Sequence, residues 1–142
     1  MTDAPLVRAD NRVVVDTDVI SFWQRKDTRG EEYRTALTFR SLLISFQTLA
    51  ELLRWAAEHN WGSARRAQME ANLQELDVLP YSLALAYEWA DVMTSSRRLG
   101  RALNAGDAWI AATARLLGVP LVTHNRRHFD VVPNLTLITF AP

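Results

Sequence analysis

Four oxygen-bearing side chains lie beside apolar segments, at positions where they could share one site. Asp16 ends the apolar run "RVVV", Glu51 lies about one turn beyond "SLLISF", Asn125 follows "PLVT", and Asp107 leads into "AWIAATARLLG". In a chain with no cysteine and no matched histidine spacing, such oxygen ligands suit Mg²⁺ or Mn²⁺ rather than zinc. A cation held in this way binds phosphate oxygens and activates water, so the chemistry indicated is phosphodiester hydrolysis.

The carboxylate of Asp107 has two interpretations. Asn104 can cap the helix that follows, and an acid three residues later resembles the partner in a capping box and suits the helix dipole. On a helical wheel, however, Asp107 shares a stripe of small residues with Ala111, Ala114 and Gly118. Such a stripe lets the helix lie close against another element, so the carboxylate is expected to point inward and to need a partner.

The other acids differ in how strongly they indicate a site. Asp16 stands at the carboxyl end of a buried strand, which is where α/β folds place their ligands. Asp18 and Thr17 are interpreted as caps of the next helix. Glu51 by itself looks solvated, because the apolar residues of its helix lie on the opposite face, although the preceding strand brings it to the same edge of the sheet.

Strands alternate with helices along the chain, which predicts βα units and a parallel sheet. The β-branched or continuously apolar segments are expected to be strands, over residues 12–16, 41–46, 77–81, 120–123 and 135–140. The segments with helical periodicity or capping residues are expected to be helices, over residues 17–26, 31–39, 47–60, 62–76, 82–100 and 103–118. Asp16 would then end the central strand.

Length and composition set the broad class. The 142 residues, 49% hydrophobic and 23% charged, predict a single globular domain over residues 1–142, with residues 1–11 as a flexible extension. Sixteen basic and sixteen acidic residues leave nucleic-acid affinity to local patches. The absence of cysteine excludes disulfides. No apolar run is long enough for a membrane span and no signal peptide is evident, so we expect a cytoplasmic protein without membrane contact.

Four stretches together resemble the PIN-domain ribonucleases of the VapC type, the toxins of type II toxin–antitoxin pairs. They are "VVVDTDVISF", "ISFQTLAELLRWA", "GDAWIAATARLLGVPLVTHNRRHF" and "LTLITF", in family order. The resemblance implies an α/β fold of three α/β/α layers around a central, mainly parallel sheet of about five strands. It also implies an Mg²⁺- or Mn²⁺-dependent endoribonuclease, an RNA substrate, a cognate antitoxin and a homodimer. Asp16, Glu51 and Asp107 would be the metal ligands, with Asn125 a fourth catalytic residue.

Three positions depart from the family pattern. The family often has aspartate where Asn125 stands, and asparagine keeps the oxygen but loses the charge. It also often has an acid at the position of His128, which we interpret as a surface residue, with a phosphate contact or a pairing with Asp130 as alternatives. Asp18 replaces a common asparagine and would return one negative charge.

Substrate contacts are expected from Thr17 and Thr123 beside the acids, and from Arg98 and Arg126 near the same edge. Solvated helix-end arginines are the alternative for the two basic residues. A catalytically weak PIN-fold module that binds RNA or assembles with a partner stays open as an alternative function, because Asn125 is neutral. A phosphatase or flap-type DNA nuclease fits less well, because the chain is short.

Overall fold

The computed structural model describes residues 10–142, so most of the expected N-terminal extension lies outside the described residues. The strands in this part are β1 (Arg12–Val15), β2 (Ser41–Ser45), β3 (Asp77–Leu79), β4 (Leu121–Val122) and β5 (Leu137–Ile138). The helices are α1 (Thr17–Gln24), α2 (Arg29–Ala36), α3 (Phe46–Glu58), α4 (Ser63–Leu73), α5 (Leu83–Arg98), α6 (Ala105–Leu117) and α7 (Arg126–Phe129). None of them has both the length and the apolar character that a bilayer crossing requires.

The strands form one parallel sheet in the order β3-β2-β1-β4-β5, so the prediction that the first strand is central is confirmed. Val14 is paired with Leu43 of β2 on one side and with Leu121 of β4 on the other. Because all strands run the same way, their carboxyl ends meet at one edge of the sheet. That edge carries the residues that follow β1, β2 and β4.

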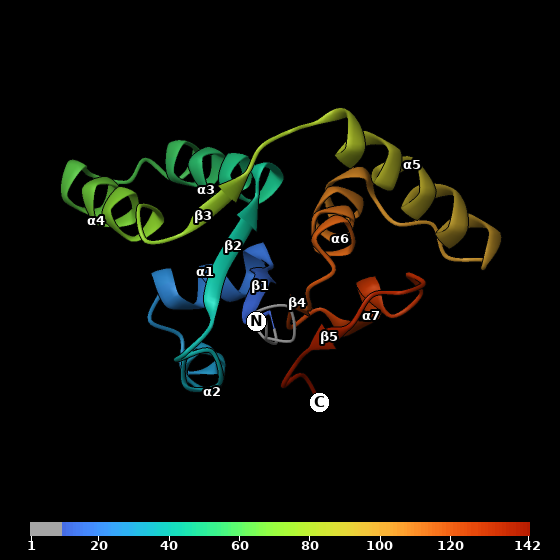
Figure 1. The fold of residues 1–142 in the computed structure, drawn as a ribbon. Coiled ribbons are helices and arrows are strands. Elements are labelled where there is room, and N and C mark those ends of the chain that lie inside the picture. Colours follow the sequence, from blue (N-terminus) through green and yellow to red (C-terminus); the bar gives the residue numbers. More distant parts are fainter. Residues whose placement is uncertain (1–9) are drawn as a thin grey trace, which may run out of the picture.

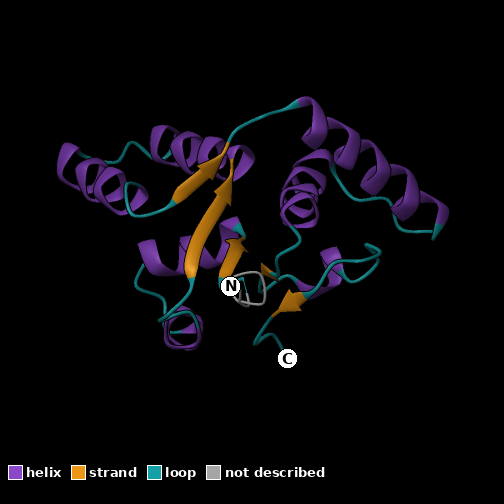
Figure 2. Cartoon of the chain, viewed as in Figure 1, coloured by secondary structure: helices purple, strands orange, loops and turns teal. Residues whose placement is uncertain are grey.

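Helices cover both faces of the sheet, which gives the three layers expected from the family resemblance (Figures 1 and 2). Alternation along β1 shows the division: Val13 and Val15 pack into a core with α1 to α4, whereas Val14 packs into a second core with α5, α6 and α7. All three valines are fully buried. This explains why the sequence of β1 is continuously apolar rather than alternating.

The helix α6 occupies the centre of the second core and places Asp107 at the sheet edge. Asn104 caps its first turn as predicted, and Gly118 ends it in the left-handed conformation with φ 67°. The small residues Ala111 and Ala114 are fully buried. At Gly106 an added Cβ would lie 3.0 Å from the Gln47 amide nitrogen, so a glycine allows α3 and α6 to approach closely at their first turns.

The four-residue helix α7 differs from the sequence-based prediction, which had no helix between 123 and 135. Its position is fixed on two sides, by Phe129 buried in the second core and by an ion pair between Asp130 and Arg101. The pairing of His128 with Asp130, one alternative from the sequence, is therefore not what the structure shows. A single helical turn has too few residues to produce a periodic pattern.

Candidate active site

Asp16 lies buried at the carboxyl end of β1, with 4% of its surface exposed. It caps α1, because its Oδ1 accepts a hydrogen bond of 2.7 Å from the backbone N–H of Thr17. The Thr123 hydroxyl donates to its Oδ2 at 2.7 Å, from the residue after β4. The carboxylate is thus held by both neighbouring elements at the edge of the sheet, and each oxygen keeps a further lone pair for a ligand.

Asp18 has a different role from the cap that the sequence suggested. Its Oδ1 accepts from the backbone N–H of Val19 at 2.7 Å, and its Oδ2 accepts from the backbone N–H of His124 at 2.9 Å. The residue that caps α1 is instead Asp16. Asp18 therefore links the first turn of α1 to the segment after β4, and it brings a second carboxylate beside Asp16.

The electrostatics of this pair favour a bound cation. Burial raises the pKa of Asp16 well above its usual range, and the Asp18 carboxylate raises that pKa further, as does Asp107. Hydrogen bonds from Thr123 and Thr17 act in the opposite direction. Burial also raises the pKa of Asp18. Two carboxylates whose pKa values are raised thus lie close together, and a divalent cation would stabilise their ionised forms.

Asp107 takes part in the cap of α6, and its carboxylate also has a partner outside that helix. Its backbone N–H donates to the Asn104 side-chain oxygen at 2.8 Å, and the Asn104 amide donates in return to Asp107 Oδ2 at 3.1 Å. The same Oδ2 lies 3.0 Å from His128 Nδ1. His128 is at the surface as predicted, with 54% of its side chain exposed, and it makes a contact with Asp107 that the sequence did not indicate.

Glu51 stands apart from the other acids. It lies on the second turn of α3, and its Oε1 accepts a hydrogen bond of 2.9 Å from Gln47. Within residues 10–142, no three His, Cys, Asp or Glu side chains are close enough together to hold a metal ion. The expected set of Asp16, Glu51 and Asp107 is thus not assembled as a three-acid cluster in this part of the chain, and neither are Asp16, Asp18 and Asp107.

Two of the expected substrate contacts are engaged inside the protein. Thr123, expected to contact substrate, is fully buried in this structure. Its hydroxyl donates to Asp16 and accepts from the backbone N–H of Asn125 at 3.0 Å, which makes it a positioning residue. The Thr17 hydroxyl donates to Thr48 at 3.0 Å. Asn125 is exposed, and its side chain makes no capping hydrogen bond to α7.

Two hollows flank His128 on the surface above these acids, and Arg127 and His128 line both. One, of about 350 Å³, is also lined by Arg101 and by Asn104 and Asp107. The other, of about 600 Å³, includes Arg126 and Asn125. The exposed Arg98, at the last turn of α5, lines neither hollow. Basic side chains therefore line the hollow that contains Asp107, and Arg126 lines the neighbouring one.

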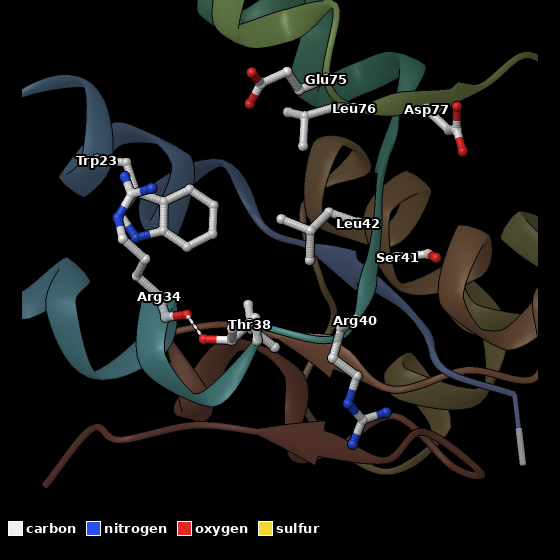
Figure 3. A pocket seen from close by; sticks show the side chains of 10 residues that line it. Trp23, Arg34, Thr38, Arg40, Ser41, Leu42, Glu75, Leu76 and Asp77 are labelled. Atoms are coloured by element: carbon white, nitrogen blue, oxygen red, sulfur yellow. Dashed lines mark hydrogen bonds between the residues drawn. The ribbon is translucent and has the colours of Figure 1, made fainter.

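A separate hollow of about 460 Å³ lies at the opposite edge of the sheet, where β2 and β3 begin (Figure 3). The Arg34 guanidinium lies over the Trp23 ring at one side of it, with the guanidinium carbon 5.2 Å from the ring centroid. Ser41 and Asp77 line its strand side. Its lining includes none of the residues that the sequence assigned to chemistry.

Comparison with known proteins matches this chain to one family over most of its length. The family model for the PIN domain matches residues 13–135. The tRNA(fMet)-specific endonuclease VapC of Shigella flexneri is 29% identical over 124 residues, which are 87% of this chain and 94% of that protein. DNA-bound VapBC of Salmonella typhimurium has a TM-score of 0.80 at 26% identity, over 90% of this chain and 97% of that one. VapBC2 of Rickettsia felis, bound to a DNA fragment from its promoter, has a TM-score of 0.80 at 20% identity. The match covers 90% of this chain and 98% of that one, and it shows a shared fold.

Proposed function

Because this chain belongs to the PIN-domain family, we propose that it is an endoribonuclease toxin that hydrolyses phosphodiester bonds of cytoplasmic RNA and is neutralised by a cognate antitoxin. The observation that carries the proposal is the buried Asp16 carboxylate, whose pKa is raised by burial and by the nearby charges of Asp18 and Asp107. These acids lie at the sheet edge where the fold binds ligands. VapC relatives named as endonucleases and ribonucleases support the activity.

The residues present fit a hard divalent cation. Mg²⁺ usually binds through one or two carboxylates, together with waters and substrate phosphates. Asp16 and Asp107 provide two, and the added charge of Asp18 would favour binding. When bound, Mg²⁺ or Mn²⁺ would supply an activated water and would stabilise the leaving oxygen. Thr123 and Asn104 orient these carboxylates, and Glu51 stays a proposed ligand for which a side-chain rearrangement would be needed.

RNA would lie across the hollows beside His128. Arg126 and Arg127 are exposed there, and arginine is suited to contacting phosphates without regard to sequence. Arg101 already pairs with Asp130, so its main role is to stabilise the position of α7 and not to bind RNA. The basic side chains thus line the approach to Asp107 in a chain whose overall charge is balanced.

Two protein partners belong to the proposal. Solved VapBC complexes with a similar fold support an antitoxin. A second copy of the chain would cover large apolar side chains that are exposed around the start of α5, namely Tyr81, Leu83 and Tyr87. Tyr87→Glu should then shift the purified protein from dimer to monomer in light scattering, whereas a monomeric unsubstituted chain would exclude this face as a dimer contact.

The experiment that tests the activity compares end-labelled RNA and DNA of the same sequence, each with Mg²⁺ and with EDTA. We expect RNA to be cut internally with Mg²⁺ and DNA to stay intact. The separation of Glu51 and the neutral Asn125 favour one other candidate, a catalytically weak module that binds RNA. Binding of RNA without cleavage would support that module, and cleavage of DNA alone would contradict both candidates.

Asn125→Asp is expected to tighten Mg²⁺ and Mn²⁺ binding. Asn125 is exposed beside Thr123, and a charged oxygen there would attract a divalent cation more strongly than the neutral amide does. Calorimetric titration should show a several-fold lower Kd. The matched control is Asn72→Asp on α4, which adds the same charge on another surface and should leave the Kd unchanged. Equal Kd values for Asn125→Asp and the unsubstituted protein would exclude residue 125 from the cation site.

A further inference from the structure

His128 contacts Asp107 in a way that selects one carboxylate oxygen. The Asn104 amide and His128 Nδ1 both lie within hydrogen-bond distance of Oδ2, at 3.1 and 3.0 Å. Within residues 10–142, Oδ1 accepts no hydrogen bond from another side chain or backbone group. The two donors therefore fix the carboxylate through one oxygen and leave the other available to a ligand.

The protonation of the imidazole ring follows from this contact. An ionised carboxylate can only accept a hydrogen bond, so the proton must be on Nδ1 of His128. In the neutral ring Nε2 is then a hydrogen-bond acceptor, on a side chain that is 54% exposed. In metal sites the ligating carboxylates are typically hydrogen-bonded to neighbouring groups, which hold them in place for the metal.

The position of His128 is set by the rest of α7 and does not depend on its own contact. Phe129 is buried in the core beside α6, and Asp130 is paired with Arg101 in the segment before α6. The backbone N–H of His128 also donates to the Asn125 carbonyl at 2.9 Å. The imidazole is therefore attached to a backbone that is already ordered, so less conformational entropy is lost when its hydrogen bond to Asp107 forms.

We propose that His128 is a positioning residue that, together with Asn104, orients the Asp107 carboxylate for cation binding. The inference rests on the proposed function, in which Asp107 is a cation ligand. His128 acts through Oδ2 and leaves Oδ1 for the cation, so it contributes to the site although it has no negative charge. A histidine at this position thus supports an acid of the site where an additional acid would repel it.

The test uses His128→Ala and His128→Asn, with His59→Ala as the matched control. Asparagine places an amide donor near the position of Nδ1, whereas alanine has none. His59 is an exposed histidine at the end of α3, bonded to the Trp55 carbonyl of its own helix. Mn²⁺ affinity is measured by electron paramagnetic resonance, and kcat and KM are measured on RNA. Thermal melting of each variant checks that the fold is retained.

We expect His128→Ala to weaken Mn²⁺ binding and to lower kcat, each by about 10- to 100-fold, with KM for RNA unchanged. His128→Asn should restore most of both, and His59→Ala should match the unsubstituted protein. Unchanged Mn²⁺ affinity in His128→Ala would overturn the inference, and so would a raised KM with unchanged kcat, which would make His128 an RNA contact. Asp107→Asn separates the two proposals: if it too keeps Mn²⁺ binding and cleavage, the proposed site itself is wrong.

Discussion

Asp16→Asn is expected to abolish RNA cleavage while the protein stays folded. Asparagine can still accept from the backbone of Thr17 and can bond the Thr123 hydroxyl, so the local contacts are kept. The charge that would hold the cation is lost, and the several kcal/mol that a catalytic cation supplies correspond to a rate reduction of about 10³-fold or more. Initial rates on labelled RNA measure this. Asp77→Asn, an exposed change at the opposite edge of the sheet, is the control and should cleave normally.

The same substitution should raise the melting temperature of the metal-free protein at neutral pH. The folded-state pKa of Asp16 is raised above the ordinary value of 3.8, so its contribution to stability is present below that pH and is lost as pH rises through the folded pKa. Asparagine does not ionise and escapes this loss. Melting curves at acidic and neutral pH test the sign: the gain should be larger at neutral pH. A lower melting temperature at neutral pH would show that the Asp16 charge stabilises the fold.

Removal of divalent cations is expected to eliminate cleavage, and Mn²⁺ or Mg²⁺ should restore it. The carboxylates of the buried Asp16 and the half-buried Asp18 have no basic side chain among their hydrogen-bond partners in residues 10–142, so a cation is the group that would balance them. Because a ligand that binds only the folded state stabilises it, a cation at 100 times its Kd should add about 2.7 kcal/mol to the free energy of unfolding. Thermal melting with and without Mg²⁺ measures this.

The control for cation removal is the Asp16→Asn protein, whose melting temperature should respond much less to Mg²⁺. The two measurements together separate binding from chemistry. Cleavage that persists in EDTA, with no change in melting temperature on adding Mg²⁺, would contradict a cation site at this edge of the sheet.

The central sheet and the location of the candidate site could be predicted from sequence because local patterns determine both. A fully buried parallel strand is apolar at every position, so "RVVV" identified β1 and placed Asp16 at its carboxyl end. The Asn104–Asp107 spacing likewise predicted the cap of α6, since its two hydrogen bonds join residues three positions apart. The contact of His128 with Asp107 comes from outside α6, and no local pattern predicted it.

The contacts that were missed depend on tertiary packing. His128 reaches Asp107 because Phe129 is buried and Asp130 pairs with Arg101, and a four-residue helix gives no periodic signal. The pattern gave no reason to expect Asp18 to bond the backbone of His124, 106 residues later. The contact between Gln47 and Glu51 is different, because it is a local pair four residues apart on α3 that the spacing of the two residues could have indicated. Burial of Thr123 follows from the position of β4 inside the sheet.

The hydrogen bond between Asp16 and Thr123 joins residues 107 positions apart, and it has a consequence for synthesis of the protein. Ribosomes elongate at about 5–20 residues per second, so roughly 5–20 s separate the addition of these two residues. Throughout that interval the nascent chain lacks β4 and α7, and for most of it α6 as well. Asp16 therefore gains its Thr123 partner only after β4 has been synthesised and has joined the sheet. The order of elements along the chain thus places assembly of the proposed site late in synthesis.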